Sequence, residues 1–501
     1  MDDTIKIAFK KNLNKFNFSS TIGVAIDSNV NIKTILNVHA YLFDEKIECG
    51  NGKAILTGKI GLKVLYIDTD GISNTITDSQ AISENIIDSA ITNDSFVIIS
   101  NQTVVANVIS SDGVLKLNCD VSLLPIMYLN IPMNNNHEHN EKTICRKSEV
   151  NVSTITSKIN SSFDYSTNFE TKYSISKILC HDSYFSLLNC VSRDNAVLIE
   201  GKLHSHLLFE TDENGETRKK ELIDTFNVAT EIPVEHISPE NEVELCFKID
   251  KNSEAISTDI EDDNSIITIK NHINVYGVCT KNINVEIVDD MFSTKNELEI
   301  ATSEREFIIF KKLEYINNKI YGELTLSDNE PAIDELISNL NITPEITNSY
   351  IKNGTLQIEG IVSSHLTYID ENKNCQHKHI ELPFILDTKM EMENAENAHE
   401  NVNILDCKIK VKRGTIIEIE YAVEICVYAH QKEQRKIINN VVLGKEINLG
   451  NYDYQIYLAK PGESRWELCK RIKISPEELE LTNKDLPLVM NGGEKIIIKR
   501  S

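Results

Sequence analysis

The chain has 501 residues and carries 51 Lys+Arg against 76 Asp+Glu, which gives a formal net charge of −25. This length is sufficient for several domains, since a typical domain has about 100–200 residues. Hydrophobic residues make up 41% and charged residues 25% of the sequence, the composition of a folded globular protein. So negative a charge argues against nucleic acid and anionic lipid as partners, because phosphate binding requires concentrated Lys and Arg.

The sequence gives no indication of membrane insertion or export. A spanning helix would need about 18 consecutive apolar residues, and no such stretch occurs. The N-terminal segment 1–16 lacks the apolar core of a signal peptide. The eleven cysteines include no C-x-x-C pair, as is typical of reduced thiols rather than of a disulfide framework. We therefore expect a cytoplasmic protein without membrane insertion.

A glycine-to-aromatic motif recurs three times along the chain. In each copy an alternating apolar segment leads to a glycine eight residues before an aromatic residue: Gly58 and Tyr66, Gly201 and Phe209, Gly360 and Tyr368. A second alternating segment follows each glycine, beginning at Gly113, Ser265 and Gly414. The copies are about 150 residues apart, so the repeating unit is a whole domain rather than a solenoid unit of about 20–50 residues.

Within each copy, apolar and polar residues alternate, which predicts strands with one buried face. Asn-Gly pairs such as Asn353-Gly354 are typical of tight hairpin turns. Helical patterns in the repeats are short, as at 82–87 and 332–340. The expected fold is mainly β, with three tandem antiparallel β domains and a small βααβ domain at the C-terminus. The expected domains are 1–130, 149–281, 299–442 and 453–500, and the expected linkers are 129–148, 281–298 and 443–453.

The C-terminal tail, residues 452–501, has a different pattern. A strand is expected from Tyr454 to a Lys-Pro-Gly turn, followed by a helix capped by Ser464 and a second helix that begins with the capping box Ser475-Pro-Glu-Glu. A closing strand is expected at 494–499. Trp466 is the only tryptophan of the chain, and we expect it to be buried as the anchor of this small core.

This tail resembles the LysM family, which binds N-acetylglucosamine polymers such as peptidoglycan and chitin. The resemblance rests on Tyr454-Gln-Ile-Tyr, Lys460-Pro-Gly-Glu-Ser-x-Trp-Glu-Leu-Cys, Ile474-Ser-Pro-Glu-Glu-Leu, Asn483 and Gly493-Glu-Lys-Ile-Ile-Ile. It implies a groove between the loop after the first strand and the loop after the second helix, with the residues Gly462, Glu463, Ser464, Arg465, Asn483, Asp485 and Leu486.

Two departures from the family pattern bear on the ligand of this groove. Arg465 stands where the family usually has an apolar residue, and Glu463-Ser464 replaces the usual Asp-Thr. We expect the Arg465 guanidinium to point into the groove, where it could form a forked pair with a carboxylate of a protein partner. Glycan binding and protein docking are therefore both open for this tail.

The three β repeats resemble the SPOCS domain of spore coat proteins from endospore-forming bacteria. The third repeat carries the resemblance best, in Ala332-Ile-Asp-Glu-Leu-Ile, Asn353-Gly-Thr-Leu-Gln-Ile-Glu-Gly and Leu366-Thr-Tyr-Ile-Asp-Glu. Tandem SPOCS domains followed by LysM are the layout of SipL-like spore morphogenetic proteins. The resemblance implies a non-catalytic spore envelope scaffold on the mother-cell side of the forespore surface, docked on a spore coat-basement protein. The alternative is attachment to the cell wall or cortex through peptidoglycan or another N-acetylglucosamine polymer.

Three His-x-His pairs raise the question of a metal site: His137/His139, His204/His206 and His377/His379. Alternate residues of a strand share a face, so His204 and His206 are the best-placed pair, but the sequence indicates no third ligand. We expect the other two pairs in polar loops. His206 and His365 both stand five residues after their glycine, where the first repeat has Lys63, which suggests a solvent-facing position. With no nucleophile, phosphate-binding or metalloprotease motif, we expect no enzyme, metal or cofactor.

Overall fold

The structure is a computed structural model that describes residues 5–25, 31–110, 114–133, 143–213, 215–261, 264–327, 329–390, 397–448 and 453–499. These residues form strands β1 to β22 and the two short helices α1 and α2, so the protein is mainly β. The sheets are antiparallel, and each of the three repeats contributes two of them.

The first sheet of each repeat is a three-stranded meander. The meanders are β3 (Ile32–Gly50), β4 (Lys53–Asp68) and β5 (Ser73–Ile87); β9 (Ile175–Arg193), β10 (Ala196–Glu213) and β11 (Glu216–Pro233); and β16 (Ile333–Lys352), β17 (Thr355–Asp370) and β18 (Cys375–Lys389). In each meander the middle strand pairs with both neighbours.

The second sheet of each repeat is built around one long central strand: β7 (Val114–Met133), β14 (Asn264–Ser293) or β20 (Ile416–Glu446). The strands that pair with them are β1 (Ile5–Asn12), β2 (Phe16–Ala25) and β6 (Phe96–Ser110); β8 (Thr143–Thr171), β12 (Glu242–Ile249) and β13 (Ala255–Glu261); and β15 (Asn296–Thr325) and β19 (Asn397–Lys412). Apolar side chains between the two sheets of a repeat form its core, as with Leu56 and Leu117, Leu203 and Val275, and Ile358 and Ile419.

The repeating sequence motifs mark equivalent strands. Gly58, Gly201 and Gly360 lie on the middle meander strands β4, β10 and β17. The second motif lies at the start of β14 and β20 and, from Val114 onward, at the start of β7, while Gly113 lies outside the described residues. Each glycine faces a β-bulge in the strand before it, where the pairing register shifts. A Cβ at Gly360 would lie 2.4 Å from the Glu345 carbonyl oxygen, so the bulge leaves no room for a side chain there.

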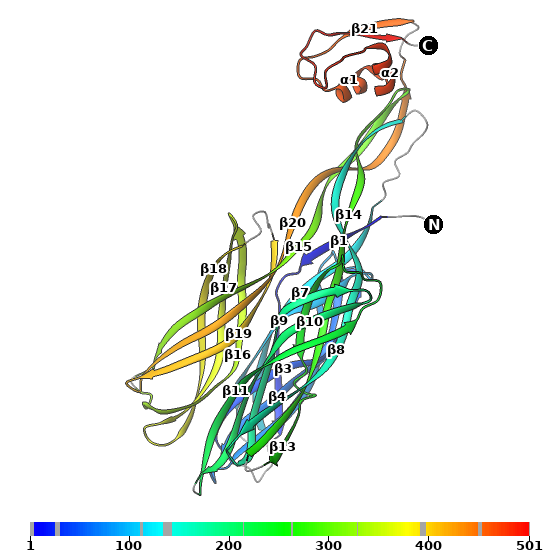
Figure 1. The fold of residues 1–501 in the computed structure, drawn as a ribbon. Coiled ribbons are helices and arrows are strands. Elements are labelled where there is room, and N and C mark those ends of the chain that lie inside the picture. Colours follow the sequence, from blue (N-terminus) through cyan, green and yellow to red (C-terminus); the bar gives the residue numbers. More distant parts are fainter. Residues whose placement is uncertain are drawn as a thin grey trace.

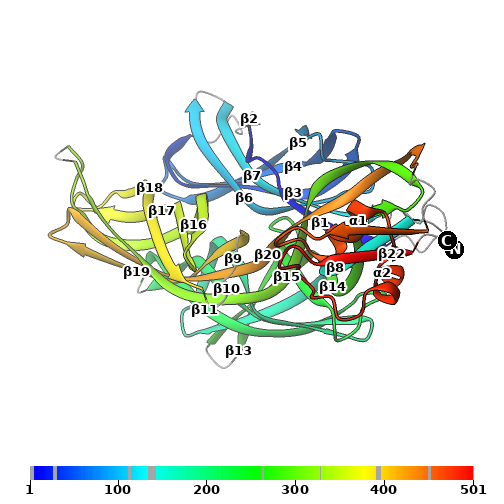
Figure 2. The same cartoon turned by 90° about the horizontal axis from the view of Figure 1, so that it is seen from above.

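The three repeats meet along a shared centre. A buried cluster takes Leu36 and Leu65 from the first repeat, Leu179 and Leu208 from the second and Leu340 from the third. Beside it, Asn341 Nδ2 donates a hydrogen bond of 2.8 Å to Asn37 Oδ1, which joins the third repeat to the first. Figure 2 shows the resulting arrangement of three lobes.

The segment 281–298, expected as a linker, belongs mostly to strands. β14 continues to Ser293, and β15 begins at Asn296 after a two-residue turn. Together with β8 and β20 these strands form an arm that extends from the body to the tail (Figure 1). The mixed charge of the segment obscured an apolar alternation in which Val285 and Ile287 pack against Phe307.

The two short helices expected within the repeats are also strands. Residues 82–87 lie in β5. Ile82 and Ile86 are four residues apart, a spacing that places two side chains on the same face in a strand as well as in a helix. Residues 332–340 fall almost wholly in β16. Register shifts at Ile333/Glu335 and Leu336/Ser338 make the apolar spacing of that strand irregular, and this imitated a helical period.

The tail contains β21 (Tyr454–Leu458), α1 (Arg465–Ile472), α2 (Pro476–Thr482) and β22 (Lys495–Lys499), with β21 and β22 paired antiparallel. Ser464 and Glu467 form a capping box at α1, and Ser475 and Glu478 form one at α2. The buried core of the tail includes Leu468, Cys469, Ile472, Leu479, Met490, Ile496 and Ile498.

Candidate functional site

The two loops expected to form the groove of the tail lie side by side. Gly462 N and Arg465 N donate hydrogen bonds to the carbonyl oxygens of Met490 and Leu488, at 2.8 and 3.1 Å. Met490 N donates in return to the Glu463 carbonyl oxygen at 2.8 Å. The first loop is therefore fixed to residues 488–490 of the loop after α2, and the backbone groups of both loops are partly used within the tail.

Glu463 and Ser464 have structural roles at this position. Glu463 is 8% exposed, and its carboxylate accepts hydrogen bonds from Arg471 Nε at 2.6 Å and from Lys460 N at 3.0 Å. The Arg471 hydrogen bond is the main cause that lowers the pKa of Glu463. Ser464 caps α1. Neither side chain is free to bind a ligand without breaking these contacts.

The second loop is anchored by Asn483 at the end of α2. Its Nδ2 donates to the Ile497 carbonyl oxygen and its Oδ1 accepts from Ile497 N, both at 2.7 Å, so the side chain ties α2 to β22. Asp485 has a positive φ of 67°, and Leu486 packs half-buried against the tail core. These residues shape the loop.

Arg465 bridges the two loops instead of pointing freely into the groove. Its Nε donates to the Pro487 carbonyl oxygen at 3.0 Å, and a terminal nitrogen pairs with Glu480 at 3.1 Å. The Arg465 guanidinium, which was expected to pair with a carboxylate of a partner, is therefore already paired with a carboxylate of the same chain. Apolar side chains remain exposed nearby on α2 and after it: Leu481 (78%), Leu488 (76%) and Val489 (55%).

Trp466 is not the buried anchor of the tail. It is half-buried and packs edge-on against Phe292 of β14, with ring centroids 5.2 Å apart. Its Nε1 donates a hydrogen bond of 2.7 Å to Asp290, which also pairs with Lys470 at 2.5 Å. The guanidinium of Arg146 lies over the indole ring. Trp466 therefore joins the tail to the tip of the arm, a role that its local sequence does not signal.

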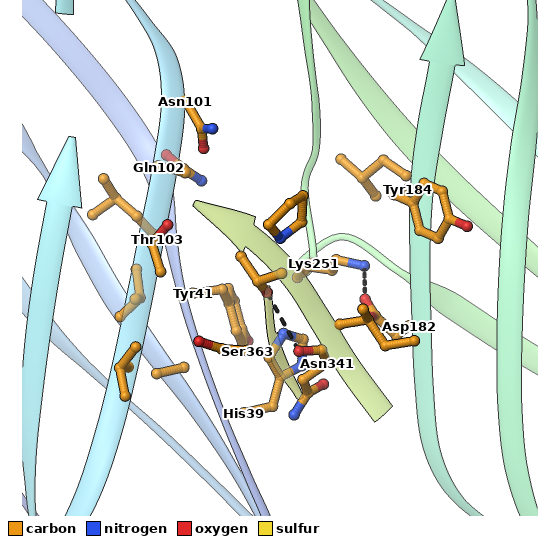
Figure 3. Close-up of a pocket in the computed structure, with 18 of the residues that line it drawn as sticks. His39, Tyr41, Asn101, Gln102, Thr103, Asp182, Tyr184, Lys251, Asn341 and Ser363 are labelled. Carbon is orange, nitrogen blue, oxygen red and sulfur yellow. Dashed lines mark hydrogen bonds and ion pairs between the residues drawn. The ribbon is translucent and has the colours of Figure 1, made fainter. Parts of the chain in front are cut away.

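A second candidate site is the cavity where the three repeats meet, shown in Figure 3. Its volume is about 270 Å³, and its lining includes His39 and Tyr41 from β3, Asp182 and Tyr184 from β9, and Asn341 from β16. Lys251, in the turn between β12 and β13, places its ammonium 2.5 Å from Asp182. Burial works to raise the pKa of Asp182, but Lys251 together with His39 and His181 outweighs it, and the pKa is lowered.

A buried polar network lies next to this cavity. Ser183 Oγ is 2.8 Å from His181 Nε2, and His181 Nδ1 is 3.2 Å from Glu254. This is the order of a serine–histidine–acid triad. Ser183, however, is 3% exposed and donates to Asn271 Oδ1 at 3.0 Å, so its hydroxyl is closed to a substrate. The network stabilises the junction, where Glu254 also binds Lys63 of the first repeat at 3.4 Å.

The equivalence of Lys63, His206 and His365 is observed, but the expected solvent-facing environment is wrong. All three lie in the middle strands of the meanders and point towards a neighbouring repeat or strand. Lys63 pairs with Glu254, and His206, 16% exposed, lies 2.9 Å from Glu221. All three positions are half-buried: the contact of Lys63 crosses to the second repeat, whereas His206 and His365 meet residues of the adjacent strand in their own meander.

His377 and His379 lie in β18 and not in a loop. His365 Nδ1 is 2.8 Å from His377 Nε2, and the His365 ring stacks on the rings of His377 and His379 at 5.0 and 4.9 Å. Burial lowers the pKa of His365 to about 3 and that of His377 to about 4. A second cavity of about 400 Å³ adjoins these three rings. His137 and His139 lie outside the described residues.

The pair favoured from sequence, His204 and His206, is less suited to a metal ion. His204 Nε2 is 3.1 Å from Ser186 Oγ, and its Nδ1 is 3.1 Å from Thr225 Oγ1, so both ring nitrogens have partners. Its ring stacks on Tyr184 at 4.6 Å, and burial lowers its pKa to about 4. His204 thus packs as a core histidine.

Searches against family models, curated proteins and solved structures gave no match for this chain. Neither of the helices in the described part of the chain is long and apolar enough to cross a membrane. The candidate sites therefore rest on their own geometry.

Proposed function

We propose that this protein is a non-catalytic scaffold of the spore envelope, which docks on a coat-basement protein at the forespore surface from the mother-cell side. The observation that carries the proposal is the position of the tail. It lies beyond the three repeats at the end of a long arm (Figure 1), where it exposes Leu481, Leu488 and Val489. Exposed apolar side chains gathered on one small unit are typical of a protein-binding surface.

The body of the protein supports a structural role. At the junction of the repeats the network Ser183–His181–Glu254 is buried, so the Ser183 hydroxyl is not accessible as a nucleophile. The resemblance of the repeats to SPOCS and of the tail to LysM supplies the expected setting, that of SipL-like proteins. In this scheme the repeats form a rigid body and the tail is the docking element.

The alternative is a protein that attaches to peptidoglycan or another N-acetylglucosamine polymer through the tail. One observation favours it, since Leu488 and Val489 flank the groove loops and could pack against the apolar face of a sugar ring. The bridge that Arg465 makes to Pro487 and Glu480 disfavours it, because a glycan would have to displace this side chain.

The test follows a fluorescent fusion of the full chain in sporulating cells. We expect Leu481→Asp with Leu488→Asp to abolish accumulation at the forespore surface, because two charges would enter the docking surface. Ile385→Asp, at an apolar site on β18 that is 65% exposed, is the control and should leave the location unchanged. An even distribution of the unmutated fusion, with normal spores after deletion of the gene, would refute the scaffold. Retention on insoluble peptidoglycan that N-acetylglucosamine oligomers compete away would establish the alternative.

A further inference from the structure

The outer face of the third meander brings three histidines together. His377 and His379 are alternate residues of β18, so both project from the same face. His365 of β17 is paired directly opposite His379, and its ring stacks on both of the others. A His-x-His pair on one strand with a third histidine on the adjacent antiparallel strand supplies three imidazole nitrogens on a single face.

The surroundings of these rings are those of a site that can admit an ion. His379 Nε2 is buried and has no hydrogen-bond partner among the described residues, an arrangement that is unfavourable unless something fills it. The adjoining cavity of about 400 Å³ is lined by the three histidines together with residues of β3 and β6, and it contains no carboxylate.

We propose that His365, His377 and His379 bind a divalent transition-metal ion of the zinc class. Imidazole is a preferred ligand of Zn²⁺, Co²⁺ and Ni²⁺, and the lack of carboxylates makes Ca²⁺ and Mg²⁺ poor candidates. Three protein nitrogens leave one position of a tetrahedral ion open towards the cavity.

Metal binding requires the rings to rearrange. No three His, Cys, Asp or Glu side chains within the described part of the chain already surround one point. His365 Nδ1 and His377 Nε2 are 2.8 Å apart in a hydrogen bond, whereas two nitrogens at about 2.0–2.1 Å from a tetrahedral ion are separated by about 3.3 Å. The ion replaces this hydrogen bond as the rings reorient, and the unpaired His379 nitrogen gains a partner.

The ion would fix the junction between repeats. β18 contacts β3 of the first repeat, and His39 of β3 lines the neighbouring cavity together with His365 and His379. Filling the site therefore stiffens the third meander where it meets the first repeat, independently of what the tail binds.

The experiment titrates Zn²⁺ and Co²⁺ into untagged full-length protein from which metals have been removed with a chelator. Calorimetry should give one high-affinity equivalent of Zn²⁺, and Co²⁺ should give the visible bands of a tetrahedral site without a thiolate charge-transfer band. The last point matters because the described chain contains free cysteines, which compete for zinc.

The variants His365→Gln and His379→Gln should each weaken Zn²⁺ binding by about 100-fold or more, since even outer-shell changes lower affinity by about 10–100-fold. His206→Gln changes the equivalent position of the second repeat and is the matched control, which should bind as the unmutated protein does. Melting curves in chelator verify that every variant is folded. Absence of a binding equivalent, a cobalt spectrum dominated by thiolate bands, or unchanged affinity in a folded His379→Gln protein would overturn the proposal.

Discussion

At the scale of single residues, the positions of side chains that contact another part of the chain differ most from those expected from sequence. As the only tryptophan of the chain, Trp466 was expected in the core of the tail, but its ring packs on Phe292 instead. Asp290 accepts from the indole nitrogen and pairs with Lys470, so one carboxylate holds two groups of the tail. Phe292 and Asp290 lie more than 170 residues before α1, and no local pattern could have linked them to it.

The carboxylate of Asp290 makes this joint sensitive to acid. Burial works to raise its pKa, but hydrogen bonds from Lys470 and Trp466 outweigh it and lower the pKa below the ordinary value of about 3.9. A lowered pKa in the folded state means that the joint is fully stabilised above about pH 4 and weakens as the pH falls below it. Fluorescence of the single tryptophan should therefore shift to longer wavelength below that pH. In Asp290→Asn the shift should already be present at pH 7, and an Asp290→Asn spectrum identical to that of the unmutated protein would contradict this role.

Arg465 offers a test of what closes the groove. Arg465→Leu removes the hydrogen bond to Pro487 and a half-exposed pair with Glu480, so it should lower the free energy of unfolding of the tail by about 0.5–1.5 kcal/mol. Glu480→Gln, which removes only the exposed pair, should have less effect. Retention of the full chain on peptidoglycan should rise in Arg465→Leu if the side chain obstructs a glycan. Equal retention of Arg465→Leu and the unmutated protein would show that the Arg465 side chain does not obstruct a glycan.

At the scale of elements, the repeating glycine is explained by the strand before it. A Cβ added at Gly201 would lie only 2.6 Å from the Ser186 carbonyl oxygen, because the adjacent bulge brings that oxygen close. A Cβ added at Gly58 would lie 3.1 Å from the Phe43 carbonyl oxygen. The motif could be found from sequence because it recurs, but its cause could not. A bulge depends on how two strands pair, and neither strand encodes that alone.

The three glycines form a natural series for mutation. Gly201→Ala and Gly360→Ala should each destabilise the protein by about 1–3 kcal/mol, because the new methyl group overlaps a carbonyl oxygen and a Phe ring. Gly58→Ala should have a smaller effect, since its nearest contact is 3.1 Å away. Urea denaturation of the full chain measures the order. Equal losses at Gly58 and Gly360 would show that the bulges relax and that close approach is not what selects glycine.

At the scale of the whole molecule, alternating apolar residues and the repeat were enough to predict a mainly β chain with antiparallel sheets. The packing of the repeats against one another was not predictable, because it is made by pairs such as Asn37 with Asn341 and Lys63 with Glu254. Such pairs have no fixed spacing and no local signature. The candidate groove residues were found through a resemblance, whereas the histidine cluster needed the pairing of β17 with β18.

A buried ion pair connects the first two repeats and should be essential to their association. Lys10 of β1 lies 2.8 Å from Glu244 of β12, with side chains 2% and 4% exposed, and Tyr128 donates to the same carboxylate. Lys10→Met would leave the Glu244 charge buried without its cation and should destabilise the protein by about 3–5 kcal/mol. Replacing both residues, as Lys10→Met with Glu244→Met, should recover part of this loss. Thermal unfolding by calorimetry measures the stability of the single and the double variant. A Lys10→Met protein as stable as the unmutated protein would show that water reaches Glu244.

The arm has a mechanical consequence. β20 pairs with β15 from Glu446 beside the tail to Ile416 inside the third repeat, without an intervening loop. A pull on the tail therefore runs along the strand axis and loads this ladder in shear, so that many hydrogen bonds resist at once instead of opening one by one. A protein that couples one layer of an assembly to another through such an arm would transmit tension without stretching.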